Sequence, residues 1–190
     1  MTPRRRVGRE TSATRHTLLD CVERLMLDEG YAAVTYRAVA AKAGVTAGLV
    51  QYYFPTLDEL FVAVVTRRSE QNLTGLREAL AQGRHPLRVL WEHSNNEATA
   101  SLTTEFLALG NHRKSIRSAI AELTNEVRDV QFAALAGLPD AATSLDLPPE
   151  ALLFLVTAVP KLLQLEEGVD VAAGHAAIVD AIEHHLDSLG

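Results

Sequence analysis

Residues 35–54 read TYRAVAAKAGVTAGLVQYYF, and this stretch decides the fold. Thr35 and Thr46 are good helix N-caps, so each one predicts the start of a short helix. Gly44 lies between them and predicts a tight turn, because glycine adopts a positive φ at little steric cost. Pro55 should end the second helix, because the residue before a proline is pushed out of helical geometry. The stretch therefore predicts two short helices joined by a tight turn.

The spacing of small and apolar residues within this stretch is that of a helix-turn-helix motif. The small Ala40 lets the two helices approach closely, and Val39, Val45 and Val50 can form a small core between them. In such a motif the second helix enters the major groove of DNA with its N-terminal residues toward the bases. An ordinary helical hairpin could also have Ala40, Gly44 and Val50 at these positions, so the spacing alone leaves both interpretations open.

A longer stretch carries a specific family resemblance. Residues 35–60 strongly resemble the DNA-binding domain of the tetracycline-repressor (TetR) family, and residues 28–31 match the end of that domain's first helix. The resemblance covers about residues 12–65, whereas the rest of the chain matches only in length and helical content. It implies an all-α fold with a three-helix helix-turn-helix DNA-binding domain. A long helix would join that domain to a C-terminal helical bundle that binds a ligand and forms a dimer.

The resemblance also implies which residues contact double-stranded DNA. Thr35 and Thr46 should bond phosphates through their hydroxyls and nearby backbone N–H groups. Gly48 should let the helix approach the DNA backbone, and Gln51 is chemically able to read adenine in the major groove. Tyr53 matches a position where the family often bonds a phosphate. The full predicted set is Thr35, Tyr36, Arg37, Thr46, Ala47, Gly48, Gln51, Tyr52 and Tyr53.

Charge is distributed unevenly along the chain. Residues 1–54 contain eight basic and five acidic residues, which gives them a net charge of +3. The remaining residues carry a net charge of −9, so the whole chain has a net charge of −6. A basic head on an acidic body suggests that the head meets a polyanion. Ala47 and Leu57 stand where the family often has a basic residue. The N-terminal arm could compensate by lying along the phosphates or in the minor groove; its arginines are Arg4, Arg5, Arg6 and Arg9. An Arg-rich terminus that is merely solvated is the alternative.

Apolar periodicity predicts helices outside the motif as well. A first helix should run from about residue 12 to Gly30, which suits the left-handed position past a helix end. Thr56 and Glu59 form a capping box at the start of a long helix that ends near residue 82. Further helical stretches are expected at about 87–108, 112–137, 149–167 and 173–189, with Gly110-Asn111 separating the first two. The predicted organisation is a disordered basic arm (1–11), a DNA-binding domain (12–56, motif 35–54) and an effector-binding and dimerisation domain (57–190).

The body is expected to form a homodimer. Residues 149–167 are apolar nearly all round, which is typical of a buried or interface helix, and Pro160 should kink that helix. Similarity to the family implies that this helix and the one at about 173–189 pair across a two-fold axis, matching a palindromic operator. Two core helices of a monomer would show the same pattern. Repression is the common mode in the family.

The body is also expected to bind a small-molecule effector. Few aromatics and many Ala, Leu and Val residues indicate an apolar or amphipathic molecule. Polar and aromatic residues on otherwise apolar helices are the candidates for its contacts, although ordinary packing explains each of them as well. They are Trp91, Asn95, Asn96, Thr99, Thr103, Phe106, His112 and Phe132. A DNA-binding repressor or architectural protein with no effector is the alternative function.

Other protein classes find little support in the sequence. No catalytic motif appears, and no cofactor or metal is expected. Zinc could be bound by residues at the spacing of His93 and Glu97, or by the histidines near the C-terminus. Histidines that are simply solvated would show the same spacings. Cys21 is the only cysteine, which fits a reducing compartment. No apolar run approaches the roughly 20 residues that span a bilayer, and no secretory signal is seen. The sequence thus predicts a cytoplasmic regulator rather than an enzyme.

Overall fold

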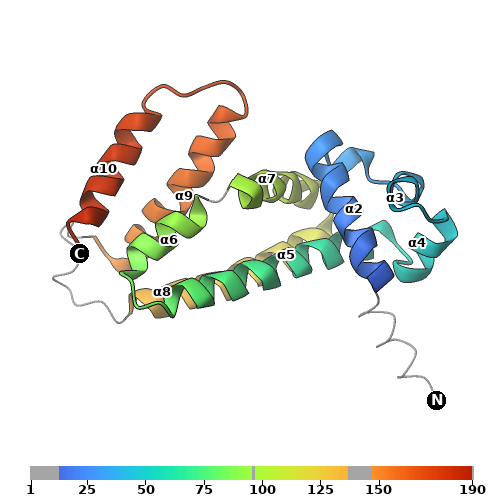
Figure 1. Ribbon diagram of the computed structural model, residues 1–190, viewed down its shortest axis with the longest axis horizontal. Coiled ribbons are helices and arrows are strands. Elements are labelled where there is room, and N and C mark those ends of the chain that lie inside the picture. Colours follow the sequence, from blue (N-terminus) through green and yellow to red (C-terminus); the bar gives the residue numbers. More distant parts are fainter. Residues whose placement is uncertain (1–12, 96, 137–146, 190) are drawn as a thin grey trace, which may run out of the picture. The chain divides into compact units, whose positions relative to one another are not determined.

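The computed structural model describes residues 13–95, 97–136 and 147–189, and every regular element in that part of the chain is helical (Figure 1). The all-α prediction is therefore confirmed. The elements, with the labels of Figure 1, are α2 (Ala13–Glu29), η1 (Tyr31–Ala33), α3 (Tyr36–Ala43), α4 (Ala47–Tyr53), α5 (Leu57–Leu80), α6 (Pro86–Ser94), α7 (Glu97–His112), α8 (Lys114–Leu135), α9 (Pro149–Glu167) and α10 (His175–Asp187).

The chain forms two compact units. The first comprises residues up to Arg68 together with Leu102–Leu123, and the second comprises Ser69–Ser101 and the residues from Thr124 onward. Helices α5, α7 and α8 each contribute residues to both units. The first unit therefore extends beyond the expected DNA-binding domain of residues 12–56, because it includes the end of α7 and the start of α8.

The first unit has one continuous apolar core. Helix α2 contributes Leu18, Val22 and Met26, and the helix-turn-helix contributes Val39 and Val50, all at most 1% exposed. Four further core residues come from the distant segment: Leu102, Phe106, Leu109 and Ile116. Burying them contributes stability in proportion to the apolar area removed from water. The core beneath the helix-turn-helix thus includes residues that lie far along the chain.

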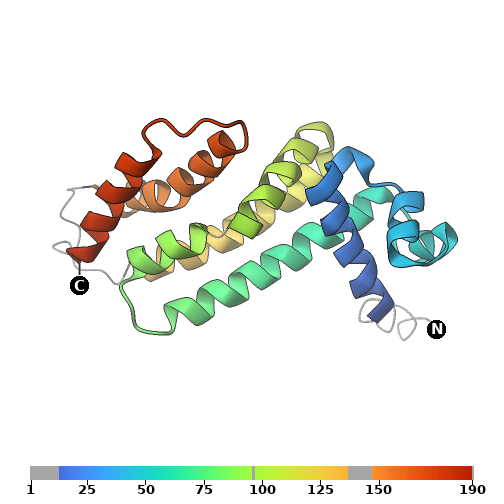
Figure 2. The ribbon, with the colours of Figure 1, turned by 45° about the horizontal axis from the view of Figure 1, so that its top comes forward.

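The second unit contains α6, α9 and α10 with the adjoining parts of α5, α7 and α8. Helix α6 packs closely on α9, and Figures 1 and 2 show α9 and α10 joined by a loop at one end. The buried residues of its core are Leu76, Leu87, Leu90, Trp91, Leu135, Leu152, Leu153, Val156 and Leu186. Helix α9 continues through Pro160.

Two expected boundaries in the body were wrong. The stretch at 87–108 is divided, because α6 ends at Ser94 and α7 begins at Glu97. Short polar side chains around Asn95 compete with helical hydrogen bonds, which explains the break. Gly110, expected to separate helices, lies inside α7. A Cβ added at Gly110 would lie 3.1 Å from Cδ1 of Ile120, so glycine here permits the close approach of α8.

Gly30 also differs from its expectation. Its φ of 78° is positive as expected, but its ψ of 164° is extended rather than left-handed helical. This region of backbone conformation is essentially restricted to glycine. The residue therefore turns the chain sharply from α2 into η1 instead of closing α2 with a left-handed cap.

Candidate nucleic-acid interface

The turn between α3 and α4 has the geometry that the sequence predicts. Gly44 adopts a left-handed conformation, with φ 67° and ψ 31°. The N–H of Val45 donates to the carbonyl oxygen of Ala40 at 2.9 Å, and the N–H of Gly44 donates to that of Ala41 at 3.3 Å. This pair of bonds is a Schellman motif, which satisfies the last carbonyl groups of α3. The chain is thereby redirected into α4.

Both helices of the motif begin at a threonine cap. The hydroxyl oxygen of Thr35 accepts from the N–H of Ala38 at 3.1 Å, and that of Thr46 accepts from the N–H of Leu49 at 3.3 Å. Each cap is worth about 1 kcal/mol. Phe54 is extended and ends α4 directly before a proline. These local predictions are therefore confirmed.

The predicted contact residues divide into an exposed group and a half-buried group. The exposed group is Thr35, Arg37, Thr46, Gly48, Gln51 and Tyr52, and the half-buried group is Tyr36, Ala47 and Tyr53. Val50 of the same helix is completely buried. Helix α4 therefore anchors one face in the core of the first unit and leaves Gln51 and Tyr52 accessible to a partner.

The tyrosines of this region have distinct surroundings. The hydroxyl of Tyr36 donates to the carbonyl oxygen of Phe54 at 3.0 Å, which ties α3 to the end of α4. Burial, with a smaller effect of Glu59, raises the pKa of the Tyr36 phenol and keeps it a donor. The rings of Tyr52 and Tyr53 meet edge to face, with centroids 5.5 Å apart. Tyr36 thus has a structural role in addition to its predicted DNA contact.

Several charges of the head are engaged inside the protein. Lys42 pairs with Asp28 at 2.8 Å, and Arg15 lies over the ring of Phe54 at 5.2 Å. Arg37 is exposed at the start of α3. The four arginines of the N-terminal arm lie outside the described residues. The net charge of the head therefore overstates the positive charge that its folded helices present.

Three hydrogen bonds join Tyr31 and Asp58 to the distant segment within the first unit, and no sequence pattern predicts them. A carboxylate oxygen of Glu105 accepts from the N–H of Tyr31 at 2.7 Å. Asp58, at the start of α5, accepts from Arg113 and Ser115. These bonds lower the pKa of the Asp58 carboxyl, the bond from Ser115 most strongly. The bond to Glu105 holds the connection after α2 against α7. The bonds to Asp58 hold the start of α5 against the residues around the start of α8.

The residues predicted to contact an effector are distributed over both units. In the first unit Thr103 is half-buried, Phe106 belongs to the core and His112 is exposed. In the second unit Phe132 packs against the core, and Asn95 is exposed at the end of α6. Asn96 lies outside the described residues, and the side chain of Thr99 is not described.

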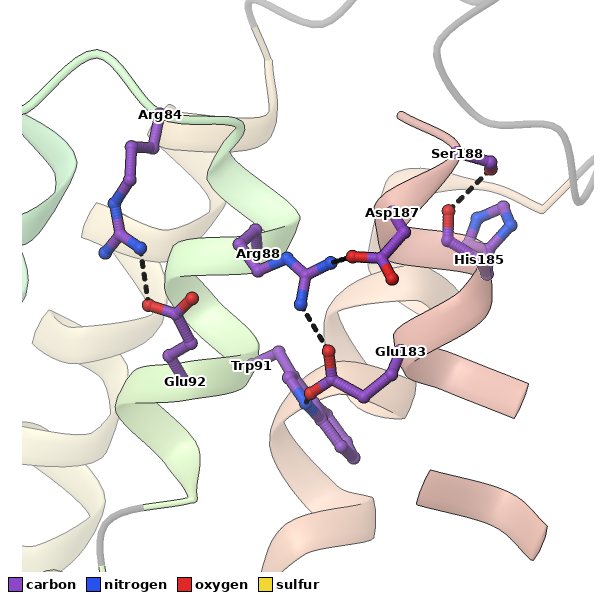
Figure 3. A network of polar contacts seen from close by, with 8 residues as sticks. All are labelled: Arg84, Arg88, Trp91, Glu92, Glu183, His185, Asp187 and Ser188. Atoms are coloured by element: carbon purple, nitrogen blue, oxygen red, sulfur yellow. Dashed lines mark hydrogen bonds and ion pairs between the residues drawn. The ribbon is translucent and has the colours of Figure 1, made fainter. Parts of the chain in front are cut away.

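Trp91, a further candidate, is completely buried and is held by a polar network between α6 and α10 (Figure 3). Its indole N–H donates to one carboxylate oxygen of Glu183 at 2.5 Å. The other oxygen of Glu183 accepts from Arg88, which also pairs with Asp187. The network holds α10 against α6, and Trp91 contributes a buried ring and one hydrogen bond to that contact.

The histidines named as an alternative metal site are separated or engaged elsewhere. Nε2 of His93 lies 2.7 Å from Oδ1 of Asn72, and Nε2 of His175 lies 2.7 Å from Glu166. Within residues 13–95, 97–136 and 147–189, no three metal-binding side chains come together. None of the helices in that same part combines the length and apolar character needed to cross a bilayer.

This geometry is that of a helix-turn-helix motif. Residues 18–64 match the bacterial regulatory proteins of the tetR family. An HTH-type transcriptional regulator in the dhlA 5' region of Xanthobacter autotrophicus is 26% identical over 176 residues, covering 87% of this chain and 82% of the relative. Residues 18–64 thus match a tetR-family DNA-binding domain, and the chain as a whole is similar to HTH-type transcriptional regulators.

Solved structures share the fold over nearly the whole chain. A putative TetR-family regulator from Rhodococcus sp. has a TM-score of 0.75 at 17% identity, covering 94% of this chain and 99% of that one. The multidrug binding protein EbrR, in complex with imidazole, has a TM-score of 0.59 at 24% identity, covering 92% and 95%.

Proposed function

We propose that the chain is a dimeric repressor that binds a palindromic operator and releases it when a small amphipathic molecule binds the body. The observation that carries this proposal is the capped and Schellman-turned pair α3–α4, which leaves Gln51 and Tyr52 exposed beside the buried Val50. An exposed glutamine on a recognition helix can pair with adenine through two hydrogen bonds. Such a repressor would work in the cytoplasm, without a membrane partner.

Apolar exposure supports dimerisation through α9 and α10. Large side chains of α9 remain about half exposed, namely Phe154, Leu155, Leu162 and Leu165, and Ile178 of α10 is 39% exposed. Large apolar side chains left exposed on neighbouring helices are typical of an interaction site. A symmetric pairing of two copies would cover this surface and would present two reading heads with two-fold symmetry.

The division of three helices between the two units supports an effector response. Helices α5, α7 and α8 supply residues to both units, so a ligand that favours one arrangement of these helices would change the placement of the head. EbrR, which shares the fold, was solved with imidazole and with proflavin. We propose that such a ligand binds in the second unit, near the predicted contact residues Trp91, Asn95 and Phe132.

Selection of duplexes from a random pool by the purified protein tests the DNA-binding part. We expect an enriched palindrome, and we expect Gln51→Ala to lose discrimination at one base pair per half-site by about 10-fold or more, since a bidentate pair contributes about 1–3 kcal/mol. Arg37→Gln is the comparison variant, because loss of a phosphate contact weakens binding to all sequences alike. A Gln51→Ala protein with unchanged selectivity would remove Gln51 from the reading surface.

Release of the enriched operator by small molecules tests the effector part. Fluorescence anisotropy of labelled operator is measured while a library of amphipathic compounds is added at fixed salt, because salt alone changes DNA affinity. We expect at least one compound to lower operator affinity by 5- to 150-fold, the usual range of allosteric coupling. A regulator that no compound releases would instead be a repressor without an effector.

A further inference from the structure

A polar seam runs along the otherwise apolar helix α9. It consists of Thr157, Lys161 and Gln164, which follow one another at the four- and three-residue spacings that place side chains on one helix face. Thr157 is buried, and its hydroxyl donates to the carbonyl oxygen of Leu153 at 2.6 Å. Polar groups on an interior-facing helix are costly unless they find partners. Thr157 meets this need within α9, whereas Gln164 is half-buried and Lys161 is exposed, so these two side chains are open to a partner.

Arg128 of α8 meets this part of α9. Its Cζ lies 4.4 Å from the centre of the Phe154 ring, and Phe154 precedes Lys161 by about two helical turns. The Nη1 atom of Arg128 is buried without a hydrogen-bond acceptor. Four other arginines of the described residues each pair with a carboxylate: Arg67, Arg84, Arg88 and Arg113. Among the described residues no carboxylate contacts Arg128.

Lys161 adds a second positive charge beside Arg128. Lys161 keeps exposed surface, but partial desolvation by the surrounding protein, with a smaller effect of repulsion from Arg128, lowers the pKa of its ammonium group. Two cations that repel each other, with no carboxylate paired to either in the part of the chain described, are stabilised by an anion placed between them. An arginine fork suits a carboxylate in particular, because it can donate two parallel N–H bonds.

Gln164 supplies a further unmet hydrogen bond in the seam. Its amide nitrogen donates to the carbonyl oxygen of Asn95 at 3.4 Å, whereas its Oε1 is buried without a donor. A ligand with a hydroxyl or N–H near its acidic group would satisfy this acceptor. Phe154 and Leu162, which belong to the apolar surface proposed above for dimerisation, lie on α9 beside the seam, so a ligand bound here would lie at the edge of that interface.

We propose that Arg128, Lys161 and Gln164 form a binding site for the carboxylate group of an amphipathic small molecule whose apolar part lies along α9. This inference rests on the proposed effector response and narrows its ligand from an amphipathic molecule to an amphipathic acid. Arg128 and Lys161 hold the carboxylate, Phe154 supports the guanidinium from one side, and Gln164 accepts from a donor group of the ligand.

The test compares three ten-carbon probes that differ in head-group charge: sodium decanoate, 1-decanol and decyltrimethylammonium. Each is titrated into the full-length protein below its aggregation concentration, and binding is followed by calorimetry and by the fluorescence of Trp91, the only tryptophan. We expect decanoate to bind saturably and at least 10-fold more tightly than decanol, because hydrogen bonds to charged groups are worth about 1.5–3 kcal/mol. The cationic probe should bind most weakly.

Variants assign the preference to the site. Arg128→Gln with Lys161→Gln should reduce decanoate affinity about 10- to 100-fold while leaving decanol affinity within 2-fold. Arg128→Lys with Lys161→Arg keeps both charges and should restore most of the decanoate binding. Arg77→Gln removes one charge from an exposed position of α5 and should change nothing. Circular dichroism confirms that each variant is folded.

Three outcomes overturn the proposal. The parent protein binds decanoate no better than decanol, it shows no saturable decanoate binding, or the double glutamine variant binds decanoate as the parent does. Sedimentation of the same variants tests whether a second copy of the chain, rather than a ligand, supplies the anion. If the double variant loses dimerisation and the parent shows no preference for decanoate, a carboxylate of a second copy holds the two cations. The operator-release screen is scored separately, so a neutral effector found there would refute the acid site while the repressor proposal stands.

Discussion

Removing the Glu183 carboxylate should loosen the second unit, because this side chain holds the buried indole N–H of Trp91. Trp91 is 0% exposed and donates to Oε1 of Glu183 at 2.5 Å. In Glu183→Ala the N–H loses its acceptor, and a buried donor without a partner costs about 1–3 kcal/mol. The ion pair with Arg88 adds little, about 0–1 kcal/mol, because the Glu183 side chain is 39% exposed.

The expected loss is therefore about 2 kcal/mol in the free energy of unfolding. For a chain of this size that corresponds to a fall of about 4–8 °C in Tm. Urea unfolding followed by the emission of Trp91 measures it directly, since this residue is the only tryptophan. All variants are compared at one protein concentration, because association raises apparent stability.

Two neighbouring substitutions separate the hydrogen bond from the charge. Glu183→Gln keeps an acceptor for Trp91 but removes the ion pair, so it should cost no more than about 1 kcal/mol. Asp187→Ala removes the other carboxylate from Arg88 at a position whose side chain is 74% exposed, and it should cost less than about 1 kcal/mol. If Glu183→Ala were no more destabilising than Asp187→Ala, the buried hydrogen bond would not hold α10 on α6.

Three further predictions concern the turn, the arm and the response to pH. Gly44→Ala should destabilise the protein by about 1 kcal/mol in urea unfolding and should weaken operator binding, because a Cβ there meets no neighbour but the positive φ remains unfavourable. Deleting residues 2–9 should lower operator affinity and flatten its dependence on salt in anisotropy titrations, since phosphate-bound cations release counterions; an unchanged slope would exclude the arm from the interface. Burial lowers the pKa of His85 and His93 below 6.5, so their contribution to stability is complete above that pH and is lost as the pH falls below it. Urea unfolding between pH 8 and 5 should show this loss, and His93→Gln should reduce its slope. Glu166 raises the pKa of His175, so that residue's contribution has the opposite sign and is lost as the pH rises above 6.5.

Local chemistry made the helix-turn-helix predictable from sequence. The caps at Thr35 and Thr46 and the left-handed Gly44 depend on residues within four or five positions, so the sequence pattern alone specifies them. The wrong predictions have non-local causes. Gly110 is helical because α8 passes close to it, and a partner this specific cannot be read from the glycine itself.

The candidate sites show the same division. The exposure of Gln51 follows from the helical period of α4 and was expected from the sequence. The contact of Arg128 with Phe154 joins residues 26 positions apart, and the bond between Glu105 and Tyr31 joins residues 74 positions apart. Periodicity predicts which face of a helix is buried, but it does not predict which residue of another helix lies against that face.

The distant residues in the core of the first unit decide how an effector could act on the reading head. Leu102, Phe106 and Leu109 of α7 are packed in the same core as Val39 and Val50 of the helix-turn-helix. A protein interior is close-packed and does not deform continuously. A shift of α7 that moved these side chains would therefore have to repack the head or move it as a body. Because Glu105 on the same helix also holds the backbone of the segment that follows α2, the head would follow α7 rather than separate from it.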